Sequence, residues 1–157
     1  MKERWTDLNG DLQSNLLTAF LKHAAYIDDG RLANSQFFSN AVWSFSVMGL
    51  PWCPTAESRF NCDRDSSRAS EEVALLWTAV KSCLPRLLRS SDGIFIATIV
   101  NSLTKLEYFY GDLDPSVAQA LEAAVISAGA GLSPREIATV VYGFGKMGNN
   151  RRETLFD

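Results

Sequence analysis

The sequence has few of the residues that build metal centres and disulfide scaffolds. It contains one histidine and three cysteines, and no two of the cysteines form a CxxC pair. A structural zinc site usually needs four Cys or His ligands at short spacings, so no conventional set is available. The odd number of cysteines favours reduced, partly buried thiols. We therefore expect neither a metal ion nor any other cofactor.

Long apolar runs and excess positive charge are also missing. No uninterrupted apolar segment approaches about 18 residues, the length that a membrane-spanning helix requires, so we expect no membrane insertion. The formal net charge is −3 and the pI is near 5.2, which argues against a uniformly basic protein that binds nucleic acids non-specifically. A local basic face remains compatible with these values. The 157 residues, 46% of them hydrophobic, are enough for one domain with a substantial core.

The sequence does contain a repeated segment. Three stretches align without gaps: FFSNAVWSFSVMGL from Phe37, FIATIVNSLTKLEY from Phe95 and EIATVVYGFGKMGN from Glu136. Their apolar positions share the spacing 3-4-3, which makes one stripe along a helix and cannot form one face of a strand. The stripe is widened by a further apolar position, and its members are Phe38, Ala41, Val42, Phe45 and Met48 in the first copy, Ile96, Ile99, Val100, Leu103 and Leu106 in the second, and Ile137, Val140, Val141, Phe144 and Met147 in the third.

The third copy contains the glycine pattern of a dinucleotide-binding turn. Gly143, Gly145 and Gly148 spell G-x-G-x-x-G, which binds a pyrophosphate only where a strand precedes the glycines and a helix follows them. The alignment instead places the first two glycines inside a helix, at positions where the other copies have Ser or Thr. The third glycine falls at the predicted C-terminal end of that helix, where glycine commonly stops a helix. The repeat therefore predicts a helix here and no nucleotide site.

A further helix is predicted before each copy, so the chain alternates first and second helices three times. We expect an all-α fold, an α-solenoid of about three stacked helical hairpins at about 6–50, 70–108 and 114–149, within a single domain over 1–157. The stretch 51–70 is rich in Pro, Ser, Asp and Arg and has no helical period, so it is predicted to be an inserted loop.

Local signals mark several of these helix boundaries. Asp114-Pro115 places a capping carboxylate before a proline at the first helical position. The stretch Ser133-Pro134-Arg135-Glu136 is an S-x-x-E capping box for the helix that follows. Pro85 is expected to kink or end the helix predicted over 73–88.

The predicted second helices resemble a known family. NAVWSFSVMG and ATVVYGFGKMG are similar to the second-helix signature of octotricopeptide and related heptatricopeptide repeats, which also occurs in the helical arrays of proteins with FAST-kinase-like and RAP domains. The resemblance covers all three copies and is weaker in the preceding helices. The first copy departs from the signature with Val47 in place of lysine, and the second with Glu107 in place of glycine. The residues that match its large apolar position and its late lysine are Phe45, Leu103 and Phe144, and Lys105 and Lys146.

This resemblance implies an organellar RNA-binding protein, mitochondrial or alternatively plastid, that acts in RNA metabolism or as a subunit of a ribonucleoprotein such as the mitochondrial ribosome. Helical-repeat readers place one or two variable side chains per repeat opposite unstacked bases. Two columns three residues apart meet this requirement, and lysines near the helix ends can meet phosphates. The predicted RNA-binding residues are Asn40, Trp43, Thr98, Asn101, Lys105, Thr139, Tyr142 and Lys146. Further charge is expected from Lys22, Lys81, Arg86, Arg89, Arg151 and Arg152.

Alternatives stay open at this point. Trp43 and Tyr142 are also the kind of large aromatics that pack between repeats. The alternative function is a non-enzymatic scaffold that binds protein subunits of a larger organellar complex, with Trp52 and Phe60 of the insert as apolar docking groups. No nucleophile and base can be paired from the sequence, and His23 is expected to be a surface or packing residue, so no enzyme is predicted.

Overall fold

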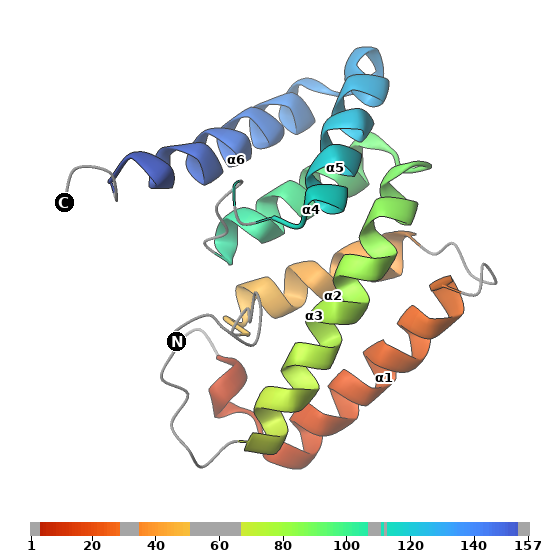
Figure 1. Cartoon of the computed structure of the whole chain (residues 1–157), viewed down its shortest axis with the longest axis vertical. Helices are drawn as coiled ribbons and strands as arrows, with labels where there is room; N and C mark the ends of the chain where they lie inside the picture. Colours follow the sequence, from red (N-terminus) through yellow and green to blue (C-terminus); the bar gives the residue numbers. More distant parts are fainter. Residues whose placement is uncertain (1–3, 29–34, 51–66, 107–110, 112, 154–157) are drawn as a thin grey trace.

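The computed structural model describes residues 4–28, 35–50, 67–106, 111 and 113–153, and within these ranges the fold is all-α, without a strand (Figure 1). A short 3-10 turn precedes the first helix, and another links the last two. The elements are η1 (Trp5–Asp7), α1 (Gly10–Asp28), α2 (Ser35–Val47), α3 (Ser67–Leu88), α4 (Gly93–Lys105), α5 (Pro115–Ala128), η3 (Gly129–Gly131) and α6 (Pro134–Glu153).

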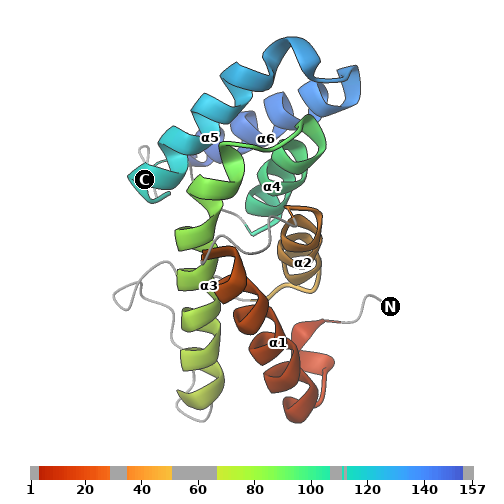
Figure 2. The same ribbon diagram turned by 90° about the vertical axis from the view of Figure 1, so that its right-hand side faces the viewer.

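The helices lie in two rows. One row consists of α1, α3 and α5, packed side by side in chain order, and the other of α2, α4 and α6 (Figure 1, Figure 2). Helices of the second row run in the same direction. A Cβ on Gly93, at the start of α4, would meet Leu132 and Glu136 at the start of α6, and the rings of Phe38 and Phe95 near the starts of α2 and α4 lie 6.5 Å apart. Matching positions of the repeated segment are therefore neighbours across α2, α4 and α6.

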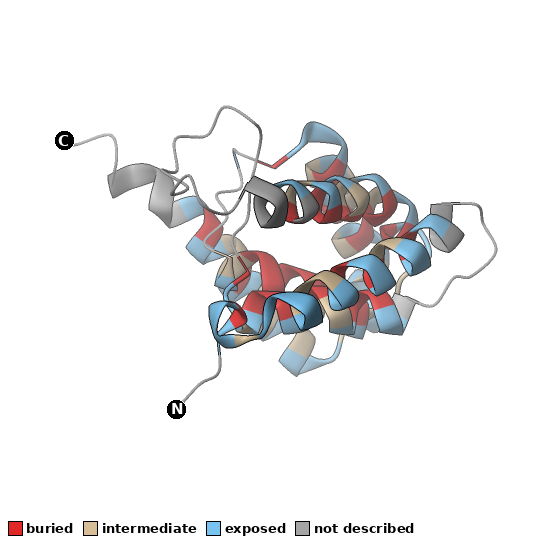
Figure 3. Cartoon of the chain, turned by 90° about the horizontal axis from the view of Figure 1, so that it is seen from below, coloured by how far each residue is buried: buried red, intermediate tan, exposed pale blue. Residues whose placement is uncertain are grey.

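The core lies between the two rows (Figure 3). Phe20 of α1 packs against Phe38 and Phe45 of α2, with ring centroids 5.7 and 5.5 Å apart. Trp77 of α3 and Leu121 of α5 are fully buried in the same cluster. Since complete burial of one large apolar side chain contributes about 1.5–3 kcal/mol, these contacts between rows are a major source of stability.

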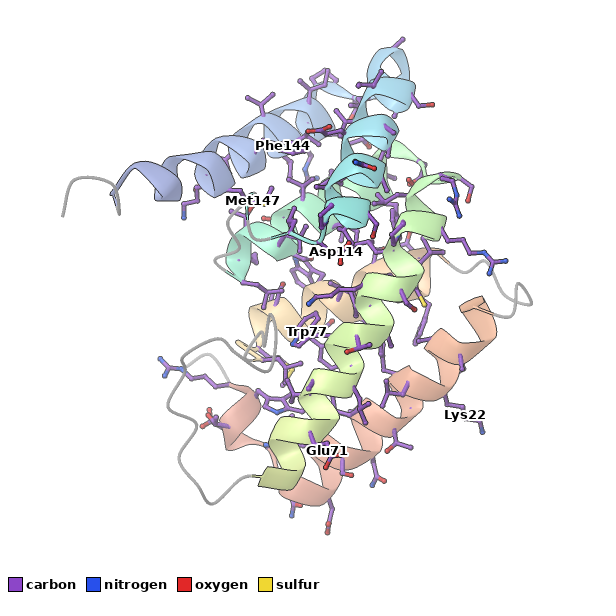
Figure 4. The ribbon with its side chains drawn as sticks, in the orientation of Figure 1. Lys22, Glu71, Trp77, Asp114, Phe144 and Met147 are labelled. Atoms are coloured by element: carbon purple, nitrogen blue, oxygen red, sulfur yellow. The ribbon has the colours of Figure 1, made fainter. Side chains whose placement is uncertain are left out.

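Every member of the apolar stripe is buried or half-buried in the first two copies, but the stripe is only partly covered in α6. Val140 and Met147 are buried, and Phe144 is half-buried (Figure 4). Ile137 and Val141 are 45% and 66% exposed, so the prediction that they belong to the core is wrong. The equivalent residues of α2 and α4 are covered by the next helix of the row, and α6 is the last helix of this row in the described part of the chain.

Both predicted caps are confirmed. The carboxylate of Asp114 accepts hydrogen bonds from the backbone N–H of Ser116, at 2.9 Å, and from its hydroxyl, at 2.7 Å. These bonds favour the ionised form and hold the pKa of Asp114 below its usual value of 3.8. In the capping box, the Ser133 N–H donates to Glu136 Oε2 at 2.7 Å, and the Glu136 N–H donates to Ser133 Oγ at 3.4 Å.

The predicted end of α6 at Gly148 is wrong, because the helix continues to Glu153. The equivalent Gly49 follows α2 with φ at 69°, and the next N–H, that of Leu50, donates to the carbonyl of Phe45 at 3.0 Å. Leu50 is 1% exposed, so its burial anchors this turn. Asparagine follows Gly148 and offers no apolar side chain for such an anchor.

The start of α3 also differs from the prediction, because the helix begins at Ser67, inside the segment 51–70 that was expected to be a loop. Its end at Leu88 is the predicted one, and Pro85 lies inside the helix and does not end it. Residues 51–66 of the insert, with Trp52 and Phe60, lie outside the described residues.

Candidate nucleic-acid interface

One side of α2, α4 and α6 points away from the core, and we call it the outer face. It consists of four matching positions on each helix, at spacings 4-3-4, opposite the buried stripe. Every one of these side chains is exposed or half-buried. The members are Gln36, Asn40, Trp43 and Val47 of α2, Ile94, Thr98, Asn101 and Lys105 of α4, and Arg135, Thr139, Tyr142 and Lys146 of α6. The structure thus brings all eight predicted RNA-binding residues onto one surface.

The outer face is positively charged although the whole chain is acidic. It carries Lys105, Arg135 and Lys146 and no Asp or Glu, so three positive charges and no negative ones give +3, against −3 for the chain. Arg135 was not among the residues predicted from the sequence, where it aligns with Gln36 and Ile94. Four of the other predicted cations belong to the other row of helices, namely Lys22 on α1, Lys81 and Arg86 on α3, and Arg89 just after α3. The side chains of Arg151 and Arg152 are not among the described ones.

Both aromatic residues of the outer face are accessible. Trp43 is 41% exposed and Tyr142 is 61% exposed, so neither ring is buried between helices. The Lys146 Nζ lies 5.9 Å from the centroid of the Tyr142 ring, within the range of a cation–π contact. A flat π surface and a positive charge therefore lie together on α6, and a nucleotide offers a matching base and phosphate.

The polar side chains of the outer face have defined hydrogen-bonding roles. The Thr98 hydroxyl donates to the Ile94 carbonyl at 2.7 Å, and the Thr139 hydroxyl donates to the Arg135 carbonyl at 2.9 Å. Since each hydroxyl has one proton, both threonines present acceptor lone pairs to a ligand. The Asn40 Oδ1 accepts from Gln36 Nε2 at 2.9 Å, so its amide nitrogen is the group that can donate outward.

The G-x-G-x-x-G stretch lies within α6, and residues 138–142 before it are helical. A Cβ on Gly143 would collide with Val100 Cγ1 and lie 3.0 Å from Thr104 Oγ1, both on α4. This glycine therefore allows two helices to approach closely. The geometry excludes the strand and turn that a dinucleotide site requires.

Other kinds of site have little support in the described part of the chain. No group of three or more His, Cys, Asp or Glu residues there could hold a metal ion. None of its helices has the length and apolarity needed to cross a bilayer. A small depression between α3, α4 and α5 is lined mainly by apolar side chains such as Val80, Leu103 and Val117. His23 is exposed, with its ring 5.0 Å from that of Phe37.

No protein-family model, curated protein or solved structure matches the chain. The likeness to octotricopeptide and heptatricopeptide repeats therefore stands on the repeated segments alone.

Proposed function

We infer that the chain is an RNA-binding α-solenoid whose outer face contacts single-stranded RNA. The observation that carries this proposal is the outer face itself, in which three parallel helices repeat the same four accessible positions with a formal charge of +3. A helical-repeat protein contacts successive nucleotides through side chains at equivalent positions of successive repeats. Local positive charge is what it needs to hold the phosphates.

The solenoid assignment is supported by which helices pack together. In a solenoid each repeat contacts only its neighbours, and the core is continuous through the stack. Here α1 packs against α3 and α3 against α5, while α2 packs against α4 and α4 against α6. The rings of Phe20 and Phe38 join α1 to α2 across the rows, and we group α3 with α4 and α5 with α6 in the same way by their order in the chain.

Binding would combine stacking with phosphate contacts. Packed helices lie about 8–10 Å apart, so one nucleotide or two can span the step from one helix to the next. Bases stack on Trp43 and Tyr142, at about 1–3 kcal/mol per base. Lys105, Arg135 and Lys146 neutralise phosphates. With three hairpins only a few bases are contacted, so the affinity of the chain for RNA is modest.

The hydrogen-bonding pattern favours some bases over others. Thr98 and Thr139 accept hydrogen bonds, so they suit the exocyclic amino groups of adenine, cytosine and guanine. Asn40 donates through its amide and suits a carbonyl or ring nitrogen. A strand that places amino groups opposite α4 and α6 is therefore bound best.

The cellular setting follows from the resemblance. Octotricopeptide-like arrays imply a role in organellar RNA metabolism or in a ribonucleoprotein such as the mitochondrial ribosome, in the mitochondrion or alternatively the plastid. A negative net charge suits a subunit that binds RNA together with other proteins, since the chain offers only one local basic surface.

The proposal is tested by the salt dependence of binding to a short fluorescent single-stranded RNA, measured by anisotropy. Three phosphate contacts give a slope of log K against log salt of about −2, at about −0.7 per contact with a single strand. Lys146→Gln should reduce the slope by about 0.7, whereas Lys22→Gln, which removes an exposed charge from α1, should leave it unchanged (Figure 4). Equal slopes for the two variants would contradict the assignment of the outer face.

A further inference from the structure

The middle helix of the outer face differs from its two neighbours. Trp43, Asn101 and Tyr142 hold the same position of the repeat, and α4 packs between α2 and α6. The flanking helices thus carry an accessible aromatic ring at this position, while α4 carries an amide. Stacking on a ring tolerates every base, whereas the hydrogen bonds of an amide depend on the donors and acceptors of the ligand. The α4 position is therefore the one best suited to distinguish bases.

The amide of Asn101 is not engaged in the described part of the chain. The side-chain hydrogen bonds within α4 are donated by the hydroxyl groups of Thr98, Ser102 and Thr104, each to a carbonyl one turn earlier on the helix. Asn101 makes none with any described residue, and its side chain is half-buried on the outer face. Asn40 on α2 differs, because its Oδ1 already accepts from Gln36. Asn101 can thus offer both an acceptor and a donor to one ligand.

Thr98 adds a second acceptor beside this amide. Thr98 and Asn101 are three residues apart on α4, so they are neighbours on one face of the helix. The Thr98 hydroxyl donates its proton to the Ile94 carbonyl at 2.7 Å, and toward a ligand it therefore only accepts. Together the two side chains offer two acceptors and one donor. A ligand with an amino group next to a ring acceptor satisfies all three.

Adenine and cytosine have this arrangement on their Watson–Crick edges. In each base an exocyclic amino group lies beside an unprotonated ring nitrogen. The two amino protons suit Thr98 Oγ1 and Asn101 Oδ1, while Asn101 Nδ2 donates to the ring nitrogen. On the same edge guanine has a protonated ring nitrogen beside its amino group, and uracil has no amino group. Either base would leave polar groups of the site unpaired, which lowers affinity.

We propose that Asn101 and Thr98 form the specificity-determining site for the central base of the bound strand. The ligand is a single-stranded RNA with adenine or cytosine between two bases that stack on Trp43 and Tyr142. This assignment rests on the proposed RNA-binding function and narrows it, because Thr98 alone would also accept a hydrogen bond from guanine. The site reads a Watson–Crick edge, so the base at α4 must be unpaired.

The first test compares short oligouridylates in which one central nucleotide is replaced, with binding to the full chain measured by fluorescence anisotropy. Adenosine or cytidine at this position should bind at least about fivefold more tightly than guanosine or uridine, since a good bidentate pair discriminates by about 5- to 150-fold. Purine riboside lacks the amino group and 1-deazaadenosine lacks the ring acceptor, so both should lose most of this preference. The matched control is 7-deazaadenosine, which keeps the Watson–Crick edge and should bind like adenosine.

The second test changes the protein. Asn101→Leu keeps the approximate size of the side chain and removes its hydrogen-bonding groups, so the four RNAs should bind with affinities within about twofold of one another. Asn15→Leu, at an exposed position on α1, is the matched control and should leave the preference unchanged. The salt slope of about −2 should stay the same in both variants, because neither removes a phosphate contact.

The salt slope also separates failure of this base site from failure of the outer face. Equal affinities for the four RNAs, with a slope that Lys146→Gln still reduces, would overturn the base site alone. A preference that persists in Asn101→Leu would overturn it too. So would weak binding of 7-deazaadenosine, because the opposite edge of adenine would then be the one contacted. A slope that does not depend on Lys146 would overturn the proposed function and the base site with it.

Discussion

Replacing Gly143 with alanine tests the close packing of α6 on α4. In an open helix this change is stabilising by about 0.5–1 kcal/mol, because glycine loses more backbone freedom on folding than alanine. At this site the new methyl group collides with Val100 Cγ1 and lies 3.0 Å from Thr104 Oγ1. Val100 is fully buried and β-branched, so it holds one rotamer in a helix and cannot turn away.

Overpacking of this kind costs about 1–3 kcal/mol, which exceeds the gain in helix propensity. The free energy of unfolding should therefore fall by about 1 kcal/mol, and the Tm by about 2–4 °C for a chain of this size. Gly145→Ala is the matched control, two residues away on the same helix, where the new methyl group would meet no atom within 4 Å. It should raise the free energy of unfolding by about 0.5–1 kcal/mol.

Urea unfolding followed by far-UV circular dichroism measures both changes, with the m value as a check on two-state behaviour. Adding Val100→Ala to Gly143→Ala should restore part of the loss, and the double-mutant cycle isolates the coupling between the two positions. If Gly143→Ala is as stable as Gly145→Ala, α4 and α6 do not approach as closely as described.

Asp114→Ala removes the cap of α5 and should lower the free energy of unfolding by about 1 kcal/mol at neutral pH, measured in urea. The pKa of Asp114 is lower in the folded state than its unfolded value of 3.8. The contribution of this cap to the free energy of unfolding is therefore present above pH 3.8 and is lost as the pH falls through the folded-state pKa. Asp114→Asn caps the helix without titrating, so it should not show this loss in acid. Ser133→Ala breaks the capping box of α6 and should cost about 0.5–2 kcal/mol, against less than about 0.5 for the exposed control Ser127→Ala. Trp5→Ala uncovers the side of α2 that η1 packs against, and it should lower the free energy of unfolding by about 3–5 kcal/mol in urea or thermal unfolding. A decrease of less than about 1 kcal/mol would show that η1 does not cover α2.

Much of the fold follows from the spacing of apolar residues. A 3-4-3 stripe fits only a helix, so the repeat predicts second helices over the segments that start at Phe37, Phe95 and Glu136. α2, α4 and α6 each begin two residues before these positions. The caps at Asp114 and Ser133 are equally local, because the side chain and the N–H that it binds are only two or three residues apart.

Burial is less predictable, because it depends on a neighbouring helix. Val141 has the same residue type and repeat position as Val42 and Val100, and yet it is 66% exposed. In α1 the leucines at helical spacing include Leu12 and Leu16, which are 47% and 41% exposed. The stripe identifies a helix, but only the packed row shows which members another helix covers.

The sequence predicts which residues form the candidate site better than it predicts how they lie relative to the neighbouring helices. The alignment places Asn40, Thr98 and Thr139 in one column, but an aromatic such as Trp43 suits the space between repeats as well as a surface. Whether the Trp43 ring lies between repeats or on the surface depends on the direction in which it points relative to the adjacent helix. That direction is set by tertiary packing. Arg135 was missed because its repeat counterparts, Gln36 and Ile94, share no chemistry with it. The RNA-binding role of these residues stays a prediction.

The common direction of α2, α4 and α6 has an electrostatic consequence. Aligned peptide dipoles give each helix about half a positive charge at its first turn and half a negative charge at its last. Carboxylates of Asp92 and Glu136 offset the first at α4 and α6, and Lys105 offsets the second at α4. Lys105 and Lys146 hold matching positions of the repeat, so the part of a strand bound to them crosses the row at one level, where this potential changes little from helix to helix. The helix dipoles therefore do not distinguish the two directions of the strand, and its 5′-to-3′ polarity must be read by individual side chains.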